Sequence, residues 1–279
     1  MLFKEVCFFF GSDAEYQKDI LIAYLDNMGF EGVNEEDKQI SGFISDEKYS
    51  DKIMQDITNA MKDMNVELIW TVKDVPDQNW NAIWERSLEP VLIDDMCAIR
   101  APFHPEFTDF KYQITIEPKM SFGTGHHQTT QLMIKQMFEV DFKQKNVLDM
   151  GCGTGVLGIL ARMMGSSEVT MIDIDEWAFN NANENIMLNN INDIRVIHGG
   201  KEVIPLENFD IILANINKNI LKDQADVYAG CLSSGGMLMI SGFLKTDTAE
   251  LKKIFNSFGF NKNILRSLDQ WTMMMFDRN

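Results

Sequence analysis

Hydrophobic and polar residues over positions 1–75 change period in an order that predicts a small domain of its own. Short apolar runs of the kind that form strands alternate there with stretches of helical periodicity. The predicted elements are a strand at 2–10, a helix at 14–28, a strand near 32, a strand at 39–44, a helix at 49–61 and a strand at 66–72. This βαββαβ order predicts a ferredoxin-like α+β domain.

A short segment at 76–90 follows this domain. It begins at Pro76, and Trp80 and Trp84 then share one face of a predicted helix. Because indole rings bury a large apolar area, we expect a linker helix that docks through them.

Strands and helices alternate regularly over residues 91–279. This alternation predicts an α/β domain with a doubly wound, Rossmann-like sheet. The predicted strands lie at 96–100, 111–117, 147–150, 168–172, 209–217, 237–240, 264–266 and 271–276. The predicted helices lie at 132–138, 156–164, 177–188, 219–228 and 250–258. The run 271–276 is expected to pair antiparallel at the edge of an otherwise parallel sheet.

Composition limits the class of protein. With 279 residues, 45% of them hydrophobic, the chain can bury the cores of two domains. The four cysteines are scattered without close pairs, which predicts neither a disulfide framework nor a zinc ribbon and favours the cytoplasm. The apolar run 6–10 is too short for a signal peptide or a membrane span.

The net charge of −17 bears on the choice of partner. Affinity for nucleic acid rests on Lys and Arg that neutralise phosphates, so broad nucleic acid binding is not expected. A basic protein partner is favoured instead, and the alternative is a plain acidic surface that aids solubility.

The glycine-dense turn Gly151–Gly155 carries the strongest functional signal, because it lies between an apolar strand end and a helical stretch that begins at Val156. Glycine lets backbone N–H groups approach a ligand, and a helix start presents unpaired N–H groups. The turn therefore predicts a nucleotide-type ligand. The run 153–158 also fits a dinucleotide pattern, although this match alone is weak.

Asp149, just before the turn, separates these two interpretations. A dinucleotide's pyrophosphate would lie over the glycines, and two anions at about 4 Å repel by on the order of a few kcal/mol. S-adenosylmethionine carries no phosphate, and its ammonium and sulfonium groups are cations. We therefore favour S-adenosylmethionine as the cofactor, with an NAD-dependent oxidoreductase as the alternative.

Two further polar residues end predicted strands. Asp173 follows the turn by about 20 residues and is placed to accept the ribose hydroxyls, whereas Asp175 is expected to cap the next helix. Asn215 ends the following parallel strand and should lie at the same edge of the sheet. Its side-chain carbonyl is expected to hold the reacting amine, and the alternative is a helix cap.

The loop 121–130 is rich in glycine and hydroxyl groups, which predicts a cover for the cofactor. Thr129 or Thr130 is expected to present a hydroxyl from the helix start. His126 and His127 are candidate bases because of their pKa, but no third ligand of suitable spacing accompanies them, so no metal is expected.

These residues resemble the ribosomal protein L-eleven methyltransferases (PrmA), a family of class I S-adenosylmethionine-dependent enzymes. The resemblance covers most of the chain. It rests on Phe122-Gly123-Thr124-Gly125 with Thr129-Thr130, on Leu148 to Gly155, on Asp173-Ile174-Asp175, on Ala214-Asn215-Ile216, and on Ser234-Gly235-Gly236 followed by Ser241-Gly242. The glycine turn alone marks any class I methyltransferase, whereas the loop and the Ala-Asn-Ile strand end are more specific.

The resemblance implies a protein N-methyltransferase that acts on lysine ε-amines, on the N-terminal α-amine, or on both, in the large-subunit ribosomal protein L-eleven. It also implies that the N-terminal domain recognises this substrate. The alternative substrates are another basic protein or a small amine. The candidate cofactor residues are Phe122, Thr130, Asp149, Gly151, Gly153, Asp173 and Asn215, and the candidate catalytic residues are Asn215, His126 and His127.

The sequence departs from the family pattern in the loop, where it loses a glycine and a proline. Lys119 stands where the family usually has Gly, and Gln128 stands where it has Pro. Both changes alter the backbone shapes that the loop can adopt. We therefore expect differences in loop closure and substrate choice more than in cofactor binding.

Overall fold

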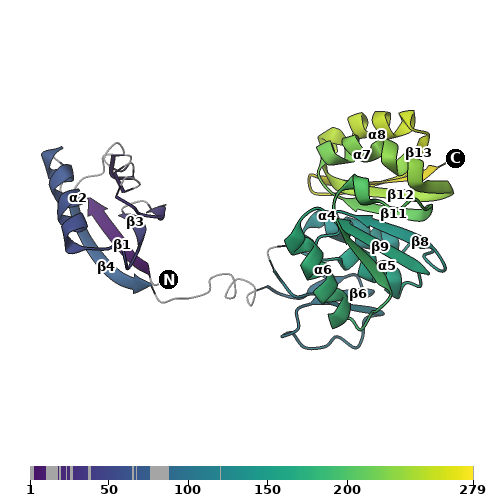
Figure 1. Cartoon of the computed structure of the whole chain (residues 1–279), viewed down its shortest axis with the longest axis horizontal. Helices are drawn as coiled ribbons and strands as arrows, with labels where there is room; N and C mark the ends of the chain where they lie inside the picture. The colour runs from purple at the N-terminus through teal and green to yellow at the C-terminus, as the bar shows by residue number, and fades with distance from the viewer. Residues whose placement is uncertain are drawn as a thin grey trace. The chain divides into compact units, whose positions relative to one another are not determined.

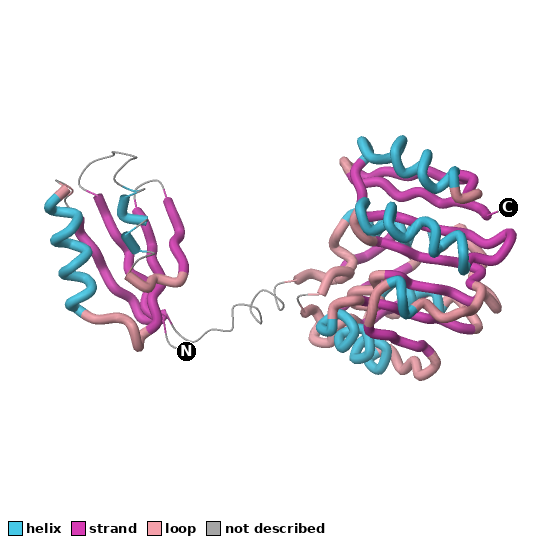
Figure 2. Tube along the Cα trace, turned by 45° about the horizontal axis from the view of Figure 1, so that its top comes forward, coloured by secondary structure: helices cyan, strands magenta, loops and turns pink. Residues whose placement is uncertain are grey.

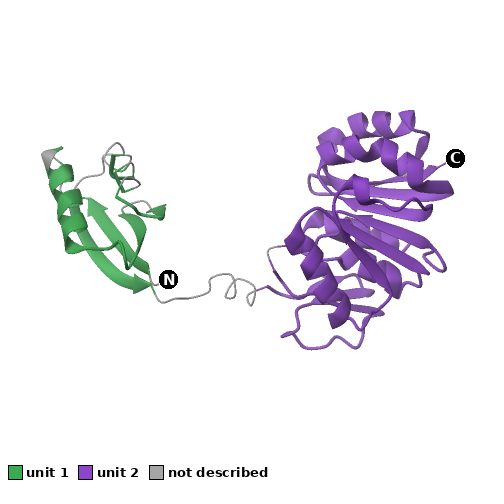
Figure 3. Cartoon of the chain, in the orientation of Figure 1, with its two compact units in different colours: residues 1–84 green, residues 85–279 purple. Residues whose placement is uncertain are grey.

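The computed structural model describes residues 3–10, 18, 20–22, 24–25, 28–36, 39–64, 66, 68–75, 88–119 and 121–278. These residues form two compact units, Met1–Trp84 and Glu85–Asn279 (Figure 3). The predicted linker helix at 76–90 lies outside the described residues except for 88–90, which form no regular element.

The first unit is one four-stranded sheet with helical cover on one face. Its elements are β1 (Phe3–Phe10), β2 (Gly32–Glu36), β3 (Gln39–Ser45), α2 (Asp51–Asp63) and β4 (Leu68–Val75). The strand order is β2-β3-β1-β4, and every pair is antiparallel. Alternate residues of β1, Val6 and Phe8, enter the core with Met54 and Ile57 of α2. This strand order is that of the predicted ferredoxin-like domain, whose predicted first helix, 14–28, lies in part outside the described residues.

The second unit is built on a seven-stranded mixed sheet (Figure 1). Its strands are β8 (Asn146–Met150), β9 (Glu168–Asp173), β10 (Ile194–His198), β11 (Phe209–Asn215), β12 (Leu232–Leu244), β13 (Phe260–Leu268) and β14 (Trp271–Arg278). They lie in the order β10-β9-β8-β11-β12-β14-β13, with the first five parallel. The sequence pattern did not predict β10.

The predicted edge position of the run 271–276 is wrong, although its antiparallel pairing is confirmed. β14 lies between β12 and β13, so β13 is the edge strand. The physical reason is burial, because Met273, Met274 and Phe276 are fully enclosed and an edge strand offers too little cover for such a run.

Helices cover both faces of this sheet (Figure 2). They are α4 (Gln128–Met137), α5 (Val156–Met163), α6 (Glu176–Leu188), α7 (Lys218–Cys231) and α8 (Thr248–Ser257). Successive side chains of β8 point to opposite faces of the sheet and so enter two different cores. Val147 packs with residues of α4 and α5, whereas Leu148 packs with residues of α7 and α8. The predicted α/β, doubly wound architecture is confirmed.

A small sheet of β5 (Val91–Ile93), β6 (Cys97–Arg100) and β7 (Tyr112–Thr115) precedes α4. β6 pairs antiparallel with β5 and parallel with β7. The chain that leaves β7 leads into the predicted cover loop.

Candidate active site

A cavity of about 740 Å³ opens at the carboxyl ends of the parallel strands. The last residues of β8, β9 and β11, which are Met150, Asp173 and Asn215, all line it. Its volume lies in the range of about 300–1,000 Å³ that is typical of small-molecule sites. The sheet edge predicted from the sequence is therefore the wall of a ligand-sized cavity.

The glycine turn forms the floor of this cavity. Gly151 and Gly153 have positive φ angles of 71° and 55°. A Cβ on Gly151 would lie 2.2 Å from Ile216, and one on Gly153 would lie 2.1 Å from the carbonyl oxygen of Phe122. Glycine is thus required for two reasons, the left-handed backbone and close contact with neighbouring protein segments.

Asp173 holds this turn in place. Its Oδ2 accepts a 2.8 Å hydrogen bond from the N–H of Gly153, and its Oδ1 accepts one of 3.0 Å from the N–H of Asp175. Asp175 accepts in turn from the N–H of Trp177 and caps α6, as predicted. The carboxylate of Asp173 retains lone pairs toward the cavity, which suits a ribose diol.

Asp149 does not lie beside the ligand cavity, where the sequence had led us to expect it. Its carboxylate is 1% exposed, does not line the cavity, and accepts a 2.9 Å hydrogen bond from the N–H of Gly158 in α5. Strand alternation turns it to the same face as Val147. Burial raises its pKa to about 7, with a smaller contribution from Asp173. The position of Asp149 therefore does not support the prediction that its charge would repel a pyrophosphate over the glycines.

Asn215 presents a free acceptor. Its Nδ2 donates a 3.3 Å hydrogen bond to Oγ1 of Thr130, while its buried Oδ1 has no hydrogen-bond partner among the described residues. The helix-cap alternative is wrong, because Asn217 caps α7 by accepting from the N–H of Ile220. Thr130 is itself buried and does not line the cavity, whereas Thr129 does.

The two histidines face different surroundings. His127 lines the cavity, with its ring centroid 5.1 Å from that of Phe122 and 4.7 Å from that of Trp271. Its Nδ1 accepts from the N–H of Thr129 and caps α4, and burial lowers its pKa. His126 is exposed and its Nε2 contacts the carbonyl oxygen of Glu89, outside the cavity lining.

The two departures from the family loop both make contacts. Lys119 forms an ion pair with Glu184 of α6, and Gln128 donates a 3.4 Å hydrogen bond to Asp269. Sequence reasoning missed Trp271 and the segment Gly199–Glu202, which also line the cavity. Trp271 comes from the C-terminal strand pair, and no motif marks it.

Within the described ranges, no group of three or more His, Cys, Asp or Glu side chains is arranged to hold a metal ion. No helix there is long and apolar enough to cross a bilayer.

Comparison with protein families decides the kind of ligand. The family model described as "Ribosomal protein L11 methyltransferase (PrmA)" matches residues 11–279. The chain belongs to this family. The predicted enzyme class, a methyltransferase that uses S-adenosylmethionine, is thereby confirmed in preference to the NAD-dependent alternative.

Relatives in the PrmA family match nearly the whole chain. The ribosomal protein L11 methyltransferase of Porphyromonas gingivalis is 40% identical over 265 residues, which are 92% of this chain and 90% of that protein. That of Phocaeicola vulgatus is 36% identical over 278 residues, 99% of each chain. A crystal structure of ribosomal protein L11 methylase from Lactobacillus delbrueckii subsp. bulgaricus is 27% identical with a TM-score of 0.64, and covers 69% of this chain and 100% of that one.

The residues at the cavity fit this cofactor. Asp173 offers carboxylate oxygens, Asn215 offers an unpartnered buried oxygen, and the exposed side chain of Ile174 supplies an apolar wall between the acids of the cavity rim.

Proposed function

We propose that this protein transfers methyl groups from S-adenosylmethionine to amines of ribosomal protein L11, namely lysine ε-amines, the N-terminal α-amine, or both. The names of the relatives support this substrate. The observation that carries the chemistry is the buried Oδ1 of Asn215, which lacks a partner among the described residues and lies at the cavity wall. An unpartnered buried acceptor is costly, and an amine N–H would satisfy it.

Asn215 orients the amine. When bound, S-adenosylmethionine supplies an electrophilic methyl group. Thr130 fixes the Asn215 amide through its hydroxyl, so that Oδ1 accepts from an amine N–H and the amine's lone pair is left free for the methyl carbon. The acceptor is neutral, so it does not stabilise the ammonium form as a carboxylate would. This matters because a lysine amine has an ordinary pKa of about 10.4 and must be neutral to react.

His127 has a different part in this scheme from the predicted base. Its Nδ1 already accepts from the N–H of Thr129, so in the neutral ring the proton resides on Nε2. Its Nε2–H can then only donate a hydrogen bond. To take the amine's proton, Nδ1 would have to give up the hydrogen bond from Thr129 that caps α4. We infer that the proton leaves to water and that Phe122, His127 and Trp271 serve as the cavity wall.

Other residues of the cavity would hold the cofactor itself. We infer that Asp173 accepts the ribose hydroxyls, and that Gly151, Gly153 and Phe122 shape the surface beneath. Thr130 acts through Asn215, and Asp149 holds the first turn of α5, which follows the glycine turn, by accepting from the N–H of Gly158.

We place the protein in the cytoplasm, without a direct nucleic acid or membrane partner. The free and buried state of Cys7, Cys97, Cys152 and Cys231 supports a reducing compartment, and the charge of −17 supports a basic partner.

Mass spectrometry of purified L11 after incubation with the enzyme and S-adenosylmethionine tests this function. We expect mass gains in steps of one methyl group, greatly reduced with Asn215→Leu and retained with Asn183→Leu. Asn183 is a suitable control because, among the described residues, its amide donates only to the carbonyl oxygen of Phe179 within α6. Cofactor binding without methylation of L11 would overturn the substrate and direct the search to other basic proteins or small amines.

A further inference from the structure

Three asparagines, two in α6 and one at its C-cap, bind the backbone at the end of β7 and in the chain that leads from it toward the cavity. They are four residues apart, at Asn181, Asn185 and Asn189, and so share one face of the helix. Asn189 uses both ends of its amide on one residue, accepting from the N–H of Thr115 (2.8 Å) and donating to its carbonyl oxygen (2.7 Å). Asn181 donates to the carbonyl oxygen of Glu117 (3.3 Å).

Asn185, the middle member, differs because it joins two segments. Its Oδ1 accepts a 2.8 Å hydrogen bond from the N–H of Glu117, and its Nδ2 donates a 2.9 Å hydrogen bond to the carbonyl oxygen of Thr154. The side chain is fully buried. One amide therefore connects the chain after β7 to the glycine turn.

Thr154 extends this connection to the cavity wall. Its N–H donates to the carbonyl oxygen of Phe122 (2.9 Å), and its Oγ1 donates to that of Gly123 (2.7 Å). Phe122 lines the cavity, and its carbonyl oxygen lies against Gly153. A continuous set of hydrogen bonds thus runs from α6 through the turn to the loop over the cavity.

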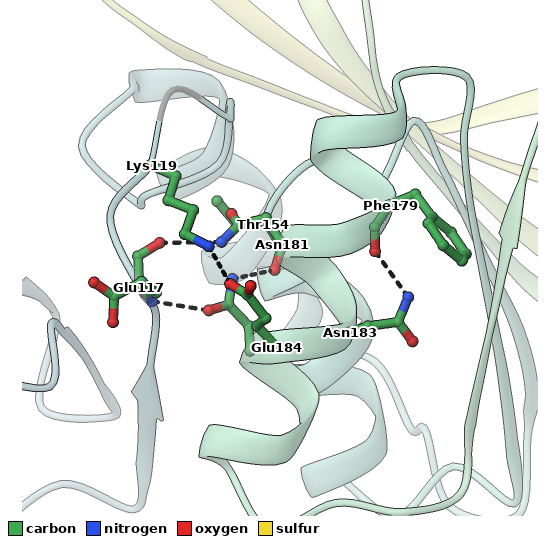
Figure 4. Close-up of polar contacts among 8 residues, drawn as sticks. Glu117, Lys119, Thr154, Phe179, Asn181, Asn183 and Glu184 are labelled. Carbon is green, nitrogen blue, oxygen red and sulfur yellow. Dashed lines mark hydrogen bonds and ion pairs between the residues drawn. The ribbon is translucent and has the colours of Figure 1, made fainter. Parts of the chain in front are cut away.

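The ion pair between Lys119 and Glu184 joins the same loop to the same helix further out (Figure 4). Both side chains are about two-fifths exposed, at 42% and 44%. Solvent screens such pairs, so this contact contributes little to the position of the loop. The amide of Asn185 is the stronger connection, because Asn185 and Thr154 are both fully buried and no solvent can replace the hydrogen bond to the carbonyl oxygen of Thr154.

We propose that Asn185 is a positioning residue for methyl transfer, which sets the separation between the glycine turn and the loop 121–127 and so the shape of the cofactor cavity. The inference rests on the proposed function, since it assumes that S-adenosylmethionine occupies this cavity. Asn185 touches neither the cavity nor the reacting atoms and acts only through Glu117 and Thr154.

The test compares Asn185→Leu with Asn183→Leu. Both replace an asparagine of the same helix by a residue of similar size, but the amide of Asn183 points away from the loop and the turn (Figure 4). The measurements are the Kd of S-adenosylhomocysteine by calorimetry, and kcat and KM for both substrates with L11.

For Asn185→Leu we expect the Kd of S-adenosylhomocysteine and the KM for S-adenosylmethionine to rise by about 10-fold or more, and kcat to fall, because small misplacements of a site are costly. The KM for L11 should stay within about twofold of the wild type, since α6 positions the cofactor loop. Asn183→Leu should leave all of these values within about twofold.

Thr154→Val provides a second, milder variant that acts further along the same set of bonds. It removes only the hydroxyl that holds Gly123 and keeps the side-chain volume. We expect the same parameters to move in the same direction, with less than additive effects in the double variant. If Asn185→Leu does not fold, the same measurements on Thr154→Val provide the test.

A folded Asn185→Leu that binds S-adenosylhomocysteine as tightly as the wild type would overturn the inference, even if its melting temperature were lower. So would wild-type affinity of Thr154→Val. Failure of the wild-type protein to bind S-adenosylhomocysteine would instead overturn the proposed function, so the two failures are distinguishable.

Discussion

The backbone N–H of Gly153 donates a 2.8 Å hydrogen bond to Oδ2 of Asp173, which joins the glycine turn to the end of the neighbouring strand. One carboxylate therefore supports the turn and faces the cavity. A change at Asp173 is expected to affect both the shape of the site and its contacts with the cofactor.

Asp173→Ala should weaken the binding of S-adenosylmethionine by about 1–3 kcal/mol, because charge-assisted hydrogen bonds are lost. Isothermal titration calorimetry measures this change. Asp193→Asn is the matched control, since Asp193 pairs with Arg162 and lies outside the cavity lining. Unaltered affinity of the Asp173 variant would show that the ribose assignment is wrong.

Thr130→Val should lower kcat/KM for the protein substrate by about 10-fold, because the amide of Asn215 loses the hydroxyl that fixes its orientation. Thr130→Ser keeps this hydroxyl and should retain nearly full activity. Steady-state kinetics with L11 distinguish the two. Equal activity of the valine and serine variants would mean that the hydrogen bond between Thr130 and Asn215 is not used in the reaction.

Asp149→Asn should change how stability depends on pH. Burial raises the pKa of Asp149 from 3.8 to about 7, so the folded protein binds this proton more tightly than the unfolded chain does. The wild type therefore loses stability as the pH rises between about 4 and 7, by up to about 4 kcal/mol, and the neutral asparagine does not.

Urea unfolding of both proteins from pH 4 to pH 8 measures this difference. The free energy of unfolding of the variant relative to the wild type should increase with pH and level off above about 7. A difference that stays constant over this range contradicts the raised pKa.

Gly153→Ala should cost about 2–5 kcal/mol of stability and abolish tight cofactor binding, because it adds a left-handed backbone penalty to a clash with the carbonyl oxygen of Phe122. Gly235→Ala isolates the first of these costs. Gly235 also has positive φ, 74°, but apart from its own and its chain neighbours' atoms, no heavy atom lies within 4 Å of the position of its Cβ. Thermal unfolding of the two variants compares them, and equal losses would exclude the clash.

The strand-end residues show how far the sequence predicts this site. Asp173 and Asn215 were expected at one edge because they end parallel strands, and both line the cavity. Asp149 also lies near a strand end, but it is one residue earlier in β8 than Met150 and therefore points to the opposite face. A single step of strand alternation separates a cavity residue from a buried one.

Other features depend on contacts between distant segments. His126 and His127 are adjacent, yet only the packing of Phe122 and Trp271 decides which ring reaches the cavity. The place of β14 inside the sheet follows from its pairing with β12 and β13, which no local pattern encodes. The four-residue spacing of Asn181, Asn185 and Asn189 can be read from the sequence. Asparagines at this spacing also suit an exposed helix face, so the spacing alone does not predict their contacts.

The bidentate contact between Asn189 and Thr115 has a consequence for the behaviour of the protein at high concentration. β7 pairs with β6 along one side, and the amide of Asn189 takes both backbone groups of Thr115 on the other. A side chain thus occupies the hydrogen-bonding positions that an added strand would need. An extended segment of another molecule therefore cannot pair with β7 through the backbone groups of Thr115 while this contact is in place.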